Sequence, residues 1–284
     1  DLRNFKKKIY LSKPHIVFHL AAQPLVSNSF QDPINTFQTN IIGTTNLLES
    51  VKITKSIKAV LVITTDKVYK VNSKNIFFKE NDELGGKDPY SASKACAELI
   101  VNSFNESFFK NKTKFKLATA RSGNVLGGGD YSKDRIFPDI LKSLNNNKEM
   151  IVRNPNHIRP WQHVIEPIHG YILLAQKLYL NKLRYTDHAW NFGPKNNSFI
   201  SVYDLINKVK KIKSFKKISF KKNKIIETKI LKLNSNKANK YLKWKQIWSI
   251  DKTISKILEW NDNLRKKNNM QEVCIKQIKE YLKI

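Results

Sequence analysis

Cysteine, glycine and proline are scarce in this chain of 284 residues. The two cysteines, Cys96 and Cys274, form no CxxC pair, which argues against a disulfide framework and a cysteine-based zinc site. With nine glycines and nine prolines, collagen-like and proline-rich repeat architectures are excluded. So few cysteines are typical of a protein from a reducing compartment, and we expect the cytoplasm.

Long apolar runs and a signal-like beginning are also lacking. No uninterrupted apolar stretch reaches the length that crosses a bilayer, and the first residues are polar. We therefore expect no membrane partner. Because 40% of the residues are hydrophobic, a disordered chain is excluded as well.

Acidic residues and arginine are few. Lysine and arginine number 52 against 23 acidic residues, for a net charge of +29, yet only seven of the 52 are arginine. The excess is spread along the chain and is densest after residue 200. A nucleic-acid reader would favour arginine forks and a concentrated basic stripe, so we expect no nucleic-acid partner. The alternative from another functional class is a non-enzymatic module that binds an acidic partner through the basic last third.

Strands and helices alternate along the first part of the chain. Buried strands are predicted at residues 15–20 (HIVFHL), 58–65 (KAVLVITT) and 115–121, and helices at 34–51 and 91–108. The helix at 34–51 places Phe37, Ile41, Thr44 and Leu48 on one side. This order predicts an α/β, doubly wound parallel sheet for residues 1–121. Residues 122–284, with a helix expected at 163–178, should form mainly a smaller lobe interleaved with the sheet.

Tyr90 and Lys94 carry the strongest local signal for chemistry. Residues four apart lie on one face of a helix, and a lysine ammonium beside a phenol favours the phenolate. Tyr90 is therefore a candidate general base near neutral pH. A surface pair at this spacing is common by chance, so the context has to support it.

That context lies at the ends of two predicted strands. In a parallel sheet, ligands bind beyond the carboxyl ends of the strands. The second strand leads to Thr65, Asp66 and Lys67, and the first leads from His19 to the small residues Ala21 and Ala22. These side chains should face the same crevice, where small residues allow a flat ligand to approach the backbone.

Six motifs support a resemblance to a known family. They are HLAAQPLV (19–26), TNIIGT (39–44), TDK (65–67), GGKDPYSASKACAEL (85–99), GNVLGGGD (123–130) and RPWQHV (159–164). Together they resemble the extended short-chain dehydrogenase/reductase family, a Rossmann-like fold, and within it the nucleotide-sugar 4,6-dehydratases of the CDP-glucose branch. The resemblance runs from residue 1 to about residue 193.

The resemblance implies a lyase that dehydrates CDP-glucose to CDP-4-keto-6-deoxyglucose with NAD. Tyr90 would take the proton of the sugar 4-hydroxyl, Lys94 would tune Tyr90, and Thr65 would bind the 4-oxygen. Asp66 would protonate the departing 6-hydroxyl. Lys67 stands where most related dehydratases carry glutamate, so it would be the base for the C5 proton.

The resemblance also implies binding residues. NAD would be held by Asp1, Ala21, Ala22, Gln23, Thr64, Tyr90 and Lys94. The nucleotide sugar would be held by Asn124 and Arg159, and Arg135 and Arg153 are weaker candidates for the same anion. No metal is expected, and the full-length protein is expected to form a homodimer.

One departure from the family is large. Neither GxGxxG nor GxxGxxG occurs in the 284 residues, although the family opens with a strand and a glycine-rich turn that bind the cofactor pyrophosphate. We therefore expect a fragment that lacks the first strands of the sheet, binds NAD weakly and is inactive by itself. The nearest alternative is a nucleotide-sugar 4-epimerase, which shares Tyr90 and Lys94 but needs no acid for a 6-hydroxyl.

Overall fold

The computed structural model describes residues 2–71, 77–110, 115–183, 188–195, 198–221 and 231–284. The chain divides into two compact units. The first comprises residues 1–122, 169–192 and 233–244, and the second comprises residues 123–168, 193–232 and 245–284. No helix in the described part of the chain is long and apolar enough to cross a membrane.

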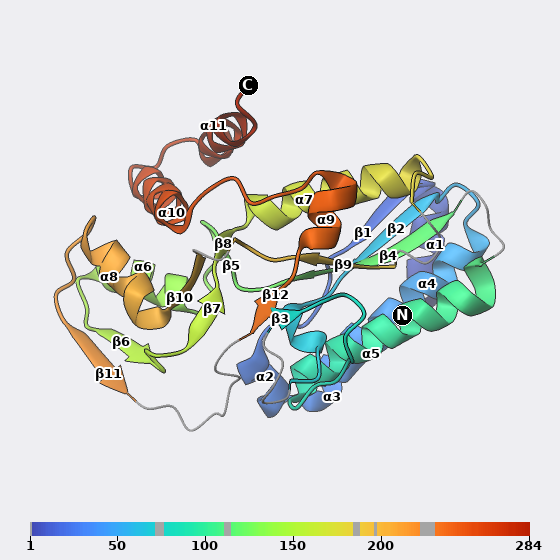
Figure 1. The fold of residues 1–284 in the computed structure, drawn as a ribbon, viewed down its shortest axis with the longest axis horizontal. Helices are drawn as coiled ribbons and strands as arrows, with labels where there is room; N and C mark the ends of the chain where they lie inside the picture. The colour runs from blue at the N-terminus through green and yellow to red at the C-terminus, as the bar shows by residue number, and fades with distance from the viewer. Residues whose placement is uncertain (1, 72–76, 111–114, 184–187, 196–197, 222–230) are drawn as a thin grey trace. The chain divides into compact units, whose positions relative to one another are not determined.

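A parallel four-stranded sheet forms the centre of the first unit (Figure 1). Its strands run in the order β1 (Ile16–His19), β2 (Ala59–Ile63), β4 (Lys116–Ser122) and β9 (Ala189–Phe192). Val17 pairs with Val60, and Val60 with Leu117. Strands β1, β2 and β4 lie within or overlap the predicted apolar runs, and the doubly wound α/β fold is confirmed. Because all four strands are parallel, their carboxyl ends share one edge of the sheet.

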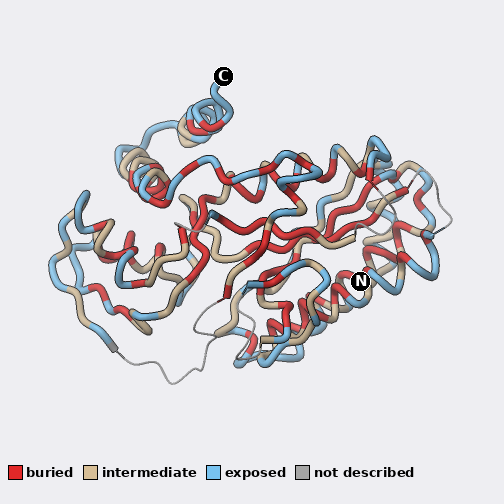
Figure 2. The backbone as a smooth tube through the Cα atoms, in the orientation of Figure 1, coloured by how far each residue is buried: buried red, intermediate tan, exposed pale blue. Residues whose placement is uncertain are grey.

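Helices cover both faces of this sheet (Figures 1 and 2). Ala59 and Leu61 point to one face, where they pack with Leu174 of helix α7 (Ile165–Tyr179) and with helix α9 (Asn236–Leu242). Val60 and Val62 point to the other, where they pack with helices α1 (Leu2–Ser12), α4 (Gly43–Ile53) and α5 (Pro89–Phe104). Each fully buried valine or leucine contributes roughly 1.5–3 kcal/mol, so this double burial holds the sheet and α5 together.

The predicted helix at residues 34–51 is divided by a π-helical turn. Short helices α2 (Val26–Gln31) and α3 (Pro33–Phe37) precede the π-helix η1 (Gln38–Ile42), and α4 follows it. The expectation of a single inward face is wrong for Phe37, which is 37% exposed, while Leu48 is fully buried. A π-turn inserts an extra residue and rotates the helix face, and here Asn40 points inward, 2% exposed.

Among the described residues, short strand pairs and four helices lie wholly within the second unit. The pairs are β5 (Val125–Leu126) with β8 (Gln162–His163), β6 (Met150–Arg153) with β11 (Ile218–Lys221), and β7 (Ile158–Pro160) with β10 (Phe199–Ser201). The helices are α6 (Ile136–Asn146), α8 (Val202–Lys210), α10 (Ile250–Arg265) and α11 (Met270–Leu282). Phe137, Leu205 and Ile257 belong to its apolar core.

The helix expected from residue 163 begins two residues later. His163 ends strand β8, and its Nδ1 accepts a hydrogen bond from Ile165 N at 3.2 Å. A side-chain acceptor that bonds a backbone N–H two residues on stabilises a turn and delays the start of a helix. Shorter elements complete the fold: β3 (Phe77–Phe78), the 3₁₀-helix η2 (Asp66–Val68), the π-helix η3 (Asn105–Phe109), and β12 (Lys232–Leu233) at a boundary between the units.

Candidate active site

Tyr90 sits in the first turn of helix α5, where the local sequence fixes the start of the helix. Asp88 is the N-cap: its carboxylate accepts hydrogen bonds from Ser91 N at 2.9 Å and Ser91 Oγ at 2.6 Å. Pro89 occupies the first helical position, where its missing N–H costs nothing. Cap and proline together hold Tyr90, 8% exposed, at the amino end of α5.

Lys94 lies one turn further along the same face and is also 8% exposed. Its Nζ donates a hydrogen bond to Ile63 O, the last residue of strand β2, at 3.0 Å. Burial lowers the pKa of Lys94 from 10.5 to about 8, and the negative charge of Glu98 opposes this shift. The group is therefore a cation at neutral pH that gives up its proton in mildly alkaline solution.

The polar residues after β2 are packed against helix α5. Thr65 and Asp66 are 7% and 4% exposed, and Thr65 Oγ1 donates to Asp66 Oδ1 at 3.0 Å. Thr65 also caps η2, since its Oγ1 accepts from Lys67 N at 3.4 Å. Element η2, which carries Asp66 and Lys67, contacts α5, which carries Tyr90 and Lys94. The structure thus brings the elements of all five predicted catalytic residues into one part of the first unit.

The loop after β1 is tied to α5 through Asn40 of the π-helix η1. Asn40 Oδ1 accepts from Gln23 N at 2.8 Å, and Asn40 Nδ2 donates to Gln23 O at 3.1 Å and to Ser93 Oγ at 2.9 Å. The side-chain amide of Gln23 bonds Thr36 and the backbone of Leu25. Gln23, Ala21 and Ala22 are therefore held beside the helix that carries Tyr90. The predicted adenine contact, Asp1, lies outside the described residues.

His19, at the end of β1, is in the neutral form at physiological pH. Burial first, and then the charge of Lys94, lowers its pKa from 6.5 to about 4. Its Nε2 lies 3.3 Å from Thr44 Oγ1, within hydrogen-bond distance. A neutral imidazole adds no second positive charge beside the Lys94 ammonium.

The residues predicted to bind the nucleotide sugar all belong to the second unit. Arg159 is 8% exposed, with Nη1 donating to Ile158 O at 3.0 Å and Nη2 3.1 Å from His157 Nδ1. Arg135 precedes helix α6 and lies 3.8 Å from a carboxylate oxygen of Asp130. The backbone oxygen of Asn124 accepts from Gln162 N at 3.2 Å. Asn124 is thus held by the short β5–β8 sheet region.

Arg153, a weaker candidate for binding the diphosphate, forms ion pairs within the second unit. Its guanidinium pairs with the carboxylates of Asp134 and Asp139. Burial works against the charge, but these two carboxylates raise the pKa of Arg153 above its ordinary value. A guanidinium that already bonds two carboxylates has few N–H donors left for a diphosphate.

Sequence reasoning missed a buried polar network behind the candidate site. Glu98 of α5 and Arg121 of β4 are 1% and 2% exposed and form an ion pair with Nε 2.8 Å from Oε1. Thr64, predicted to touch the cofactor, donates its hydroxyl proton to Glu98 at 2.5 Å. The available signal was the spacing Tyr90, Lys94, Glu98, in which each residue follows the last by one helical turn.

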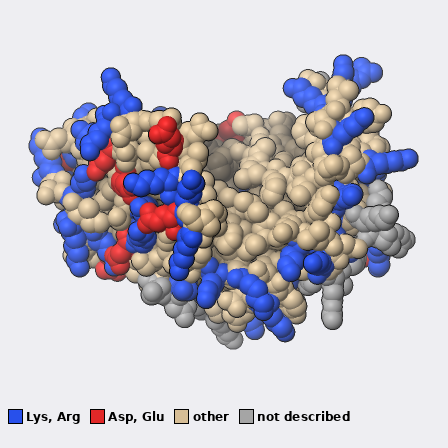
Figure 3. Space-filling view, turned by 90° about the horizontal axis from the view of Figure 1, so that it is seen from above, with Lys and Arg blue, Asp and Glu red and all other residues tan. Residues whose placement is uncertain are grey.

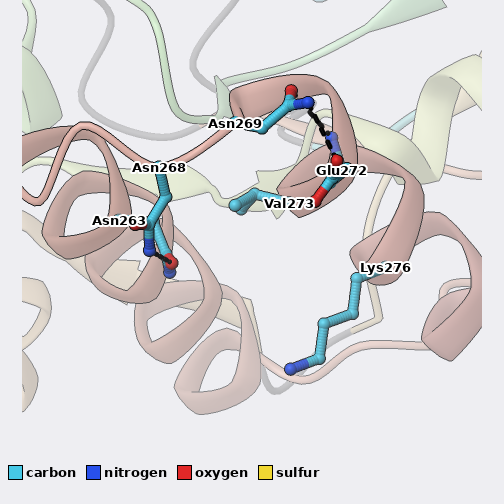
Figure 4. Close-up of a pocket in the computed structure, with 6 residues that line it drawn as sticks. All are labelled: Asn263, Asn268, Asn269, Glu272, Val273 and Lys276. Carbon is cyan, nitrogen blue, oxygen red and sulfur yellow. Dashed lines mark hydrogen bonds between the residues drawn. The ribbon is translucent and has the colours of Figure 1, made fainter.

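A hollow lies where α10 turns into α11, and none of the predicted site residues is among its lining residues (Figure 4). It is lined by Asn263, Asn268, Asn269, Glu272, Val273 and Lys276. Asn268 donates to Asn263 at 2.8 Å, and Asn269 donates to Glu272 at 2.9 Å. The side-chain amides of Asn268 and Asn269 are therefore bonded to other residues that line the hollow. Within the part of the chain that the structure describes, no cluster of His, Cys, Asp and Glu could hold a metal ion.

Basic side chains are scattered over the face shown in Figure 3 and do not gather into one continuous stripe. Several are paired with acids, such as Lys208 with Asp251 at 2.7 Å and Lys213 with Asp262 at 2.8 Å. Exposed pairs of this kind contribute little stability, about 0–1 kcal/mol each.

Comparisons with known proteins show the family of the chain and its fold. The family described as GDP-mannose 4,6 dehydratase matches residues 1–257. The CDP-glucose 4,6-dehydratase of Salmonella typhimurium is 48% identical over 217 residues, which cover 74% of this chain and 60% of that protein. The chain therefore spans about three fifths of the length of this curated relative.

Two solved structures share the fold. The UDP-glucuronic acid 4-epimerase of Bacillus cereus, in complex with UDP-glucuronic acid and NAD, superposes with a TM-score of 0.80 at 22% identity, covering 93% of this chain and 80% of that one. The dTDP-glucose 4,6-dehydratase of Bacillus anthracis, in complex with NAD, superposes with a TM-score of 0.76 at 21% identity, covering 93% and 77%. One is an epimerase and the other a dehydratase, so the fold alone does not choose the reaction.

Proposed function

The chain belongs to the GDP-mannose 4,6 dehydratase family, and from that premise we propose that it converts CDP-glucose to CDP-4-keto-6-deoxyglucose with NAD as cofactor. The observation that carries the proposal is the bond from Lys94 Nζ to Ile63 O at 3.0 Å. It joins the helix of Tyr90 to the strand end that leads directly to Thr65, Asp66 and Lys67. The similarity to the Salmonella enzyme, 48% identical, supports CDP-glucose as the substrate.

The residues present fit the nicotinamide end of NAD. Tyr90 and Lys94 are largely buried beside the carboxyl edge of the sheet, and the small side chains of Ala21 and Ala22 leave the backbone of the next loop open to a flat ligand. A glycine-rich turn for the pyrophosphate does not occur among the 284 residues. When bound, NAD supplies the hydride acceptor for C4 and the hydride donor for C6.

Tyr90 begins the proposed chemistry as a general base. Its phenolate accepts the proton of the sugar 4-hydroxyl as that carbon is oxidised, and the nearby Lys94 ammonium favours the phenolate form. The hydroxyl of Thr65 binds the 4-oxygen and fixes its direction. Oxidation at C4 makes the neighbouring C5 proton acidic.

Asp66 and Lys67 then remove water across C5 and C6. Lys67, in its neutral form, accepts the C5 proton, and Asp66, in its protonated form, gives a proton to the departing 6-hydroxyl. Asp66 is 4% exposed and accepts a hydrogen bond from Thr65 Oγ1 at 3.0 Å, so its carboxyl group is held in place. The hydride that left C4 returns to C6 and a proton returns to C5, so the net change is the loss of one water.

Arg159 and Arg135 are proposed to hold the diphosphate, with Asn124 beside them. Arg159 is the stronger candidate because its guanidinium is preorganised by bonds to Ile158 O and the ring of His157. A planar guanidinium matches paired phosphate oxygens better than a lysine does. Arg153 is left out because two carboxylates occupy it.

The test uses protein expressed from the complete coding sequence that contains these residues. It is incubated with NAD and, separately, with CDP-glucose, dTDP-glucose and GDP-mannose, and the products are read by mass and by the alkaline absorbance of a 4-keto-6-deoxy sugar. Loss of one water from CDP-glucose, faster than from the other two, is expected. Conversion to an isomer of unchanged mass would instead identify a 4-epimerase, and no conversion of any substrate would overturn the proposal.

A homodimer is proposed on the apolar surface of two packed helical segments. Helix α3 and the π-helix η1 both contact α5. They leave Ile34 (70%), Ile42 (52%) and Leu99 (57%) exposed, and exposed apolar residues on neighbouring helices are typical of an interface. Sedimentation of the complete protein is expected to give a dimer, and Leu99→Glu a monomer; a wild-type monomer would contradict this.

The free cysteines Cys96 and Cys274 support the cytoplasm as the compartment of the protein.

A further inference from the structure

Glu98 is the most completely bonded acidic side chain around helix α5. Its carboxylate accepts hydrogen bonds from Thr64 Oγ1 at 2.5 Å, Thr119 Oγ1 at 2.6 Å, and Arg121 Nε and Nη2 at 2.8 and 2.9 Å. A buried carboxylate is costly unless its lone pairs are satisfied, and here all four bonds are made. Burial acts to raise the pKa of Glu98, but Arg121 and the two threonines hold that pKa below its ordinary value.

The network continues past Arg121 and fixes the guanidinium. Arg121 Nη1 donates to Tyr69 OH at 2.8 Å and to Glu80 O at 2.9 Å. Tyr69 OH donates in turn to Asn191 Oδ1 of strand β9 at 2.7 Å. Because these partners come from separate segments of the first unit, Glu98 is held by the sheet itself and not by its own helix alone.

Two successive turns of α5 are bonded to the last residue of β2 and to the residue that follows it. Lys94 Nζ donates to Ile63 O, and Glu98 accepts from Thr64, the next residue. Tyr90, Lys94 and Glu98 follow one another at intervals of four residues and so share one face of the helix. The bonds of Glu98 therefore set where Lys94 and Tyr90 lie along the strand that leads to Thr65.

Glu98 also acts on Lys94 through its charge. Burial lowers the pKa of Lys94, and Glu98 is the charge that raises it. His19 approaches from β1, but its pKa of about 4 leaves it neutral near pH 7. Arg121, on β4, stays charged, and its positive charge is balanced by the direct ion pair with Glu98. Glu98 is thus the carboxylate that the structure relates to both buried cations.

We propose that Glu98 is a positioning residue for the reaction at Tyr90: it fixes α5 against the carboxyl end of β2 and supplies the buried negative charge that Lys94 and Arg121 share. This inference rests on the proposed function of Tyr90 and Lys94. A carboxylate that served the fold alone would stabilise α5 without any effect on the protonation of Lys94, and this difference can be measured.

The experiment follows the titration of Lys94 by NMR in the chain labelled with ¹³C and ¹⁵N lysine. The Lys94 signal is identified by its loss in Lys94→Arg. In Glu98→Gln the apparent pKa of Lys94 is expected to fall by about one unit or more, as for the loss of a nearby opposite charge. Glu98→Asp, which withdraws the carboxylate by one methylene, should give a smaller shift in the same direction.

Glu106→Gln is the matched control. Glu106 lies two turns beyond Glu98, on the π-helix η3, and forms an exposed pair with Lys110 at 3.0 Å. The control removes the same charge, and Lys94 should titrate as in the wild type. An unchanged Lys94 in Glu98→Gln would overturn the proposal, and where that variant does not fold, an unchanged Lys94 in Glu98→Asp would do so.

The complete protein gives a second readout. If the reaction needs the Lys94 ammonium, the rate falls as pH rises through the pKa of Lys94, and in Glu98→Gln this fall should begin at lower pH. The NMR titration needs no substrate, so its failure would remove the role of Glu98 and leave the proposed dehydration standing. Absence of turnover in the wild type would overturn the function and leave the coupling of Glu98 to Lys94 intact.

Discussion

Lys94 Nζ donates a hydrogen bond to the backbone oxygen of Ile63 at 3.0 Å, so a buried cation joins helix α5 to the end of strand β2. The bond satisfies one of the three donors of the ammonium. Tyr90 lies one turn earlier on the helix, and Thr65 follows two residues after the end of the strand. A charge buried in this way lowers the stability of the fold.

Replacing Lys94 by methionine should therefore stabilise the folded chain at neutral pH. The pKa of Lys94 is lowered from 10.5 to about 8 on folding, so the folded state binds fewer protons than the unfolded state between these values. The free energy of unfolding of the wild type should rise with pH across that window, by a total on the order of 3 kcal/mol. The free energy of unfolding of Lys94→Met should not show this rise with pH.

Urea denaturation at a series of pH values measures both effects. At pH 7 the variant should be more stable by roughly 1–2 kcal/mol, because the lost bond to Ile63 O offsets part of the gain. Its advantage should shrink as pH rises from 8 to 10.5. A variant that is less stable than the wild type at pH 7, with a gap independent of pH, would contradict the depressed pKa of Lys94.

Tyr90→Phe should abolish turnover of CDP-glucose in the complete protein while leaving the fold intact. Loss of a general base costs roughly 10²–10⁴-fold in rate, and phenylalanine fills almost the same volume at this position, which is 8% exposed. The measurement is the initial rate of 4-keto sugar formation, with the melting temperature as the check on folding. Tyr203→Phe, at a tyrosine 48% exposed on α8, is the matched control and should keep the wild-type rate.

Lys67→Met should prevent exchange at C5 of the sugar. In D₂O the wild-type reaction should place deuterium at C5, because the proton removed there is replaced from solvent. Without the Lys67 amine, the rate at which deuterium enters C5 should fall roughly 10²-fold or more, and little product should form. NMR of the product reads this directly. Exchange at the wild-type rate would show that another group removes the C5 proton.

Much of the first unit could be predicted from local signals. The resemblance to the extended short-chain dehydrogenase/reductase family is confirmed, and β2 and β4 follow the apolar runs that predicted them, because strands buried on both faces show as continuous apolar sequence. Helix α5 was predicted within two residues of where it begins, at Pro89. Such signals lie within one short stretch of sequence, and a single sequence displays them fully.

The features that were missed depend on partners far apart in the chain. Glu98 and Arg121 are separated by 23 residues, and the helical spacing that places Glu98 in line with Tyr90 and Lys94 does not identify Arg121 as its partner. The π-turn points Asn40 inward, where its side chain forms hydrogen bonds with Gln23 and Ser93, which lie 17 and 53 residues away. Sequence periodicity describes a helix by itself, so it could not foresee a turn whose cause is a tertiary bond.

His163 should make the second unit sensitive to acid. Burial first, and then the charge of Lys256, lowers the pKa of His163 from 6.5 to about 4, and its ring meets Trp248 edge-on at 4.9 Å. A depressed folded pKa means that the unfolded chain binds the proton first, so stability is lost as pH falls from 6.5 to 4, by a total on the order of 3 kcal/mol. His163→Asn keeps an acceptor for Ile165 N and should lose less stability across this window. Equal acid sensitivity of variant and wild type would contradict the role of His163.

Gly86→Ala should destabilise the start of helix α5. A Cβ added at Gly86 would lie 2.3 Å from Ala92 N and 2.5 Å from Ser91 C, and backbone atoms in a helix cannot move aside as a flexible side chain would. The cost should be about 1–3 kcal/mol, and it should lower the activity of the complete protein because Tyr90 lies in the displaced turn. Gly43→Ala is the control: its added Cβ meets nothing within 4 Å at the start of α4. There alanine should stabilise the helix by about 0.5–1 kcal/mol, so equal effects at both glycines would show that contact with α5 is not what Gly86 provides.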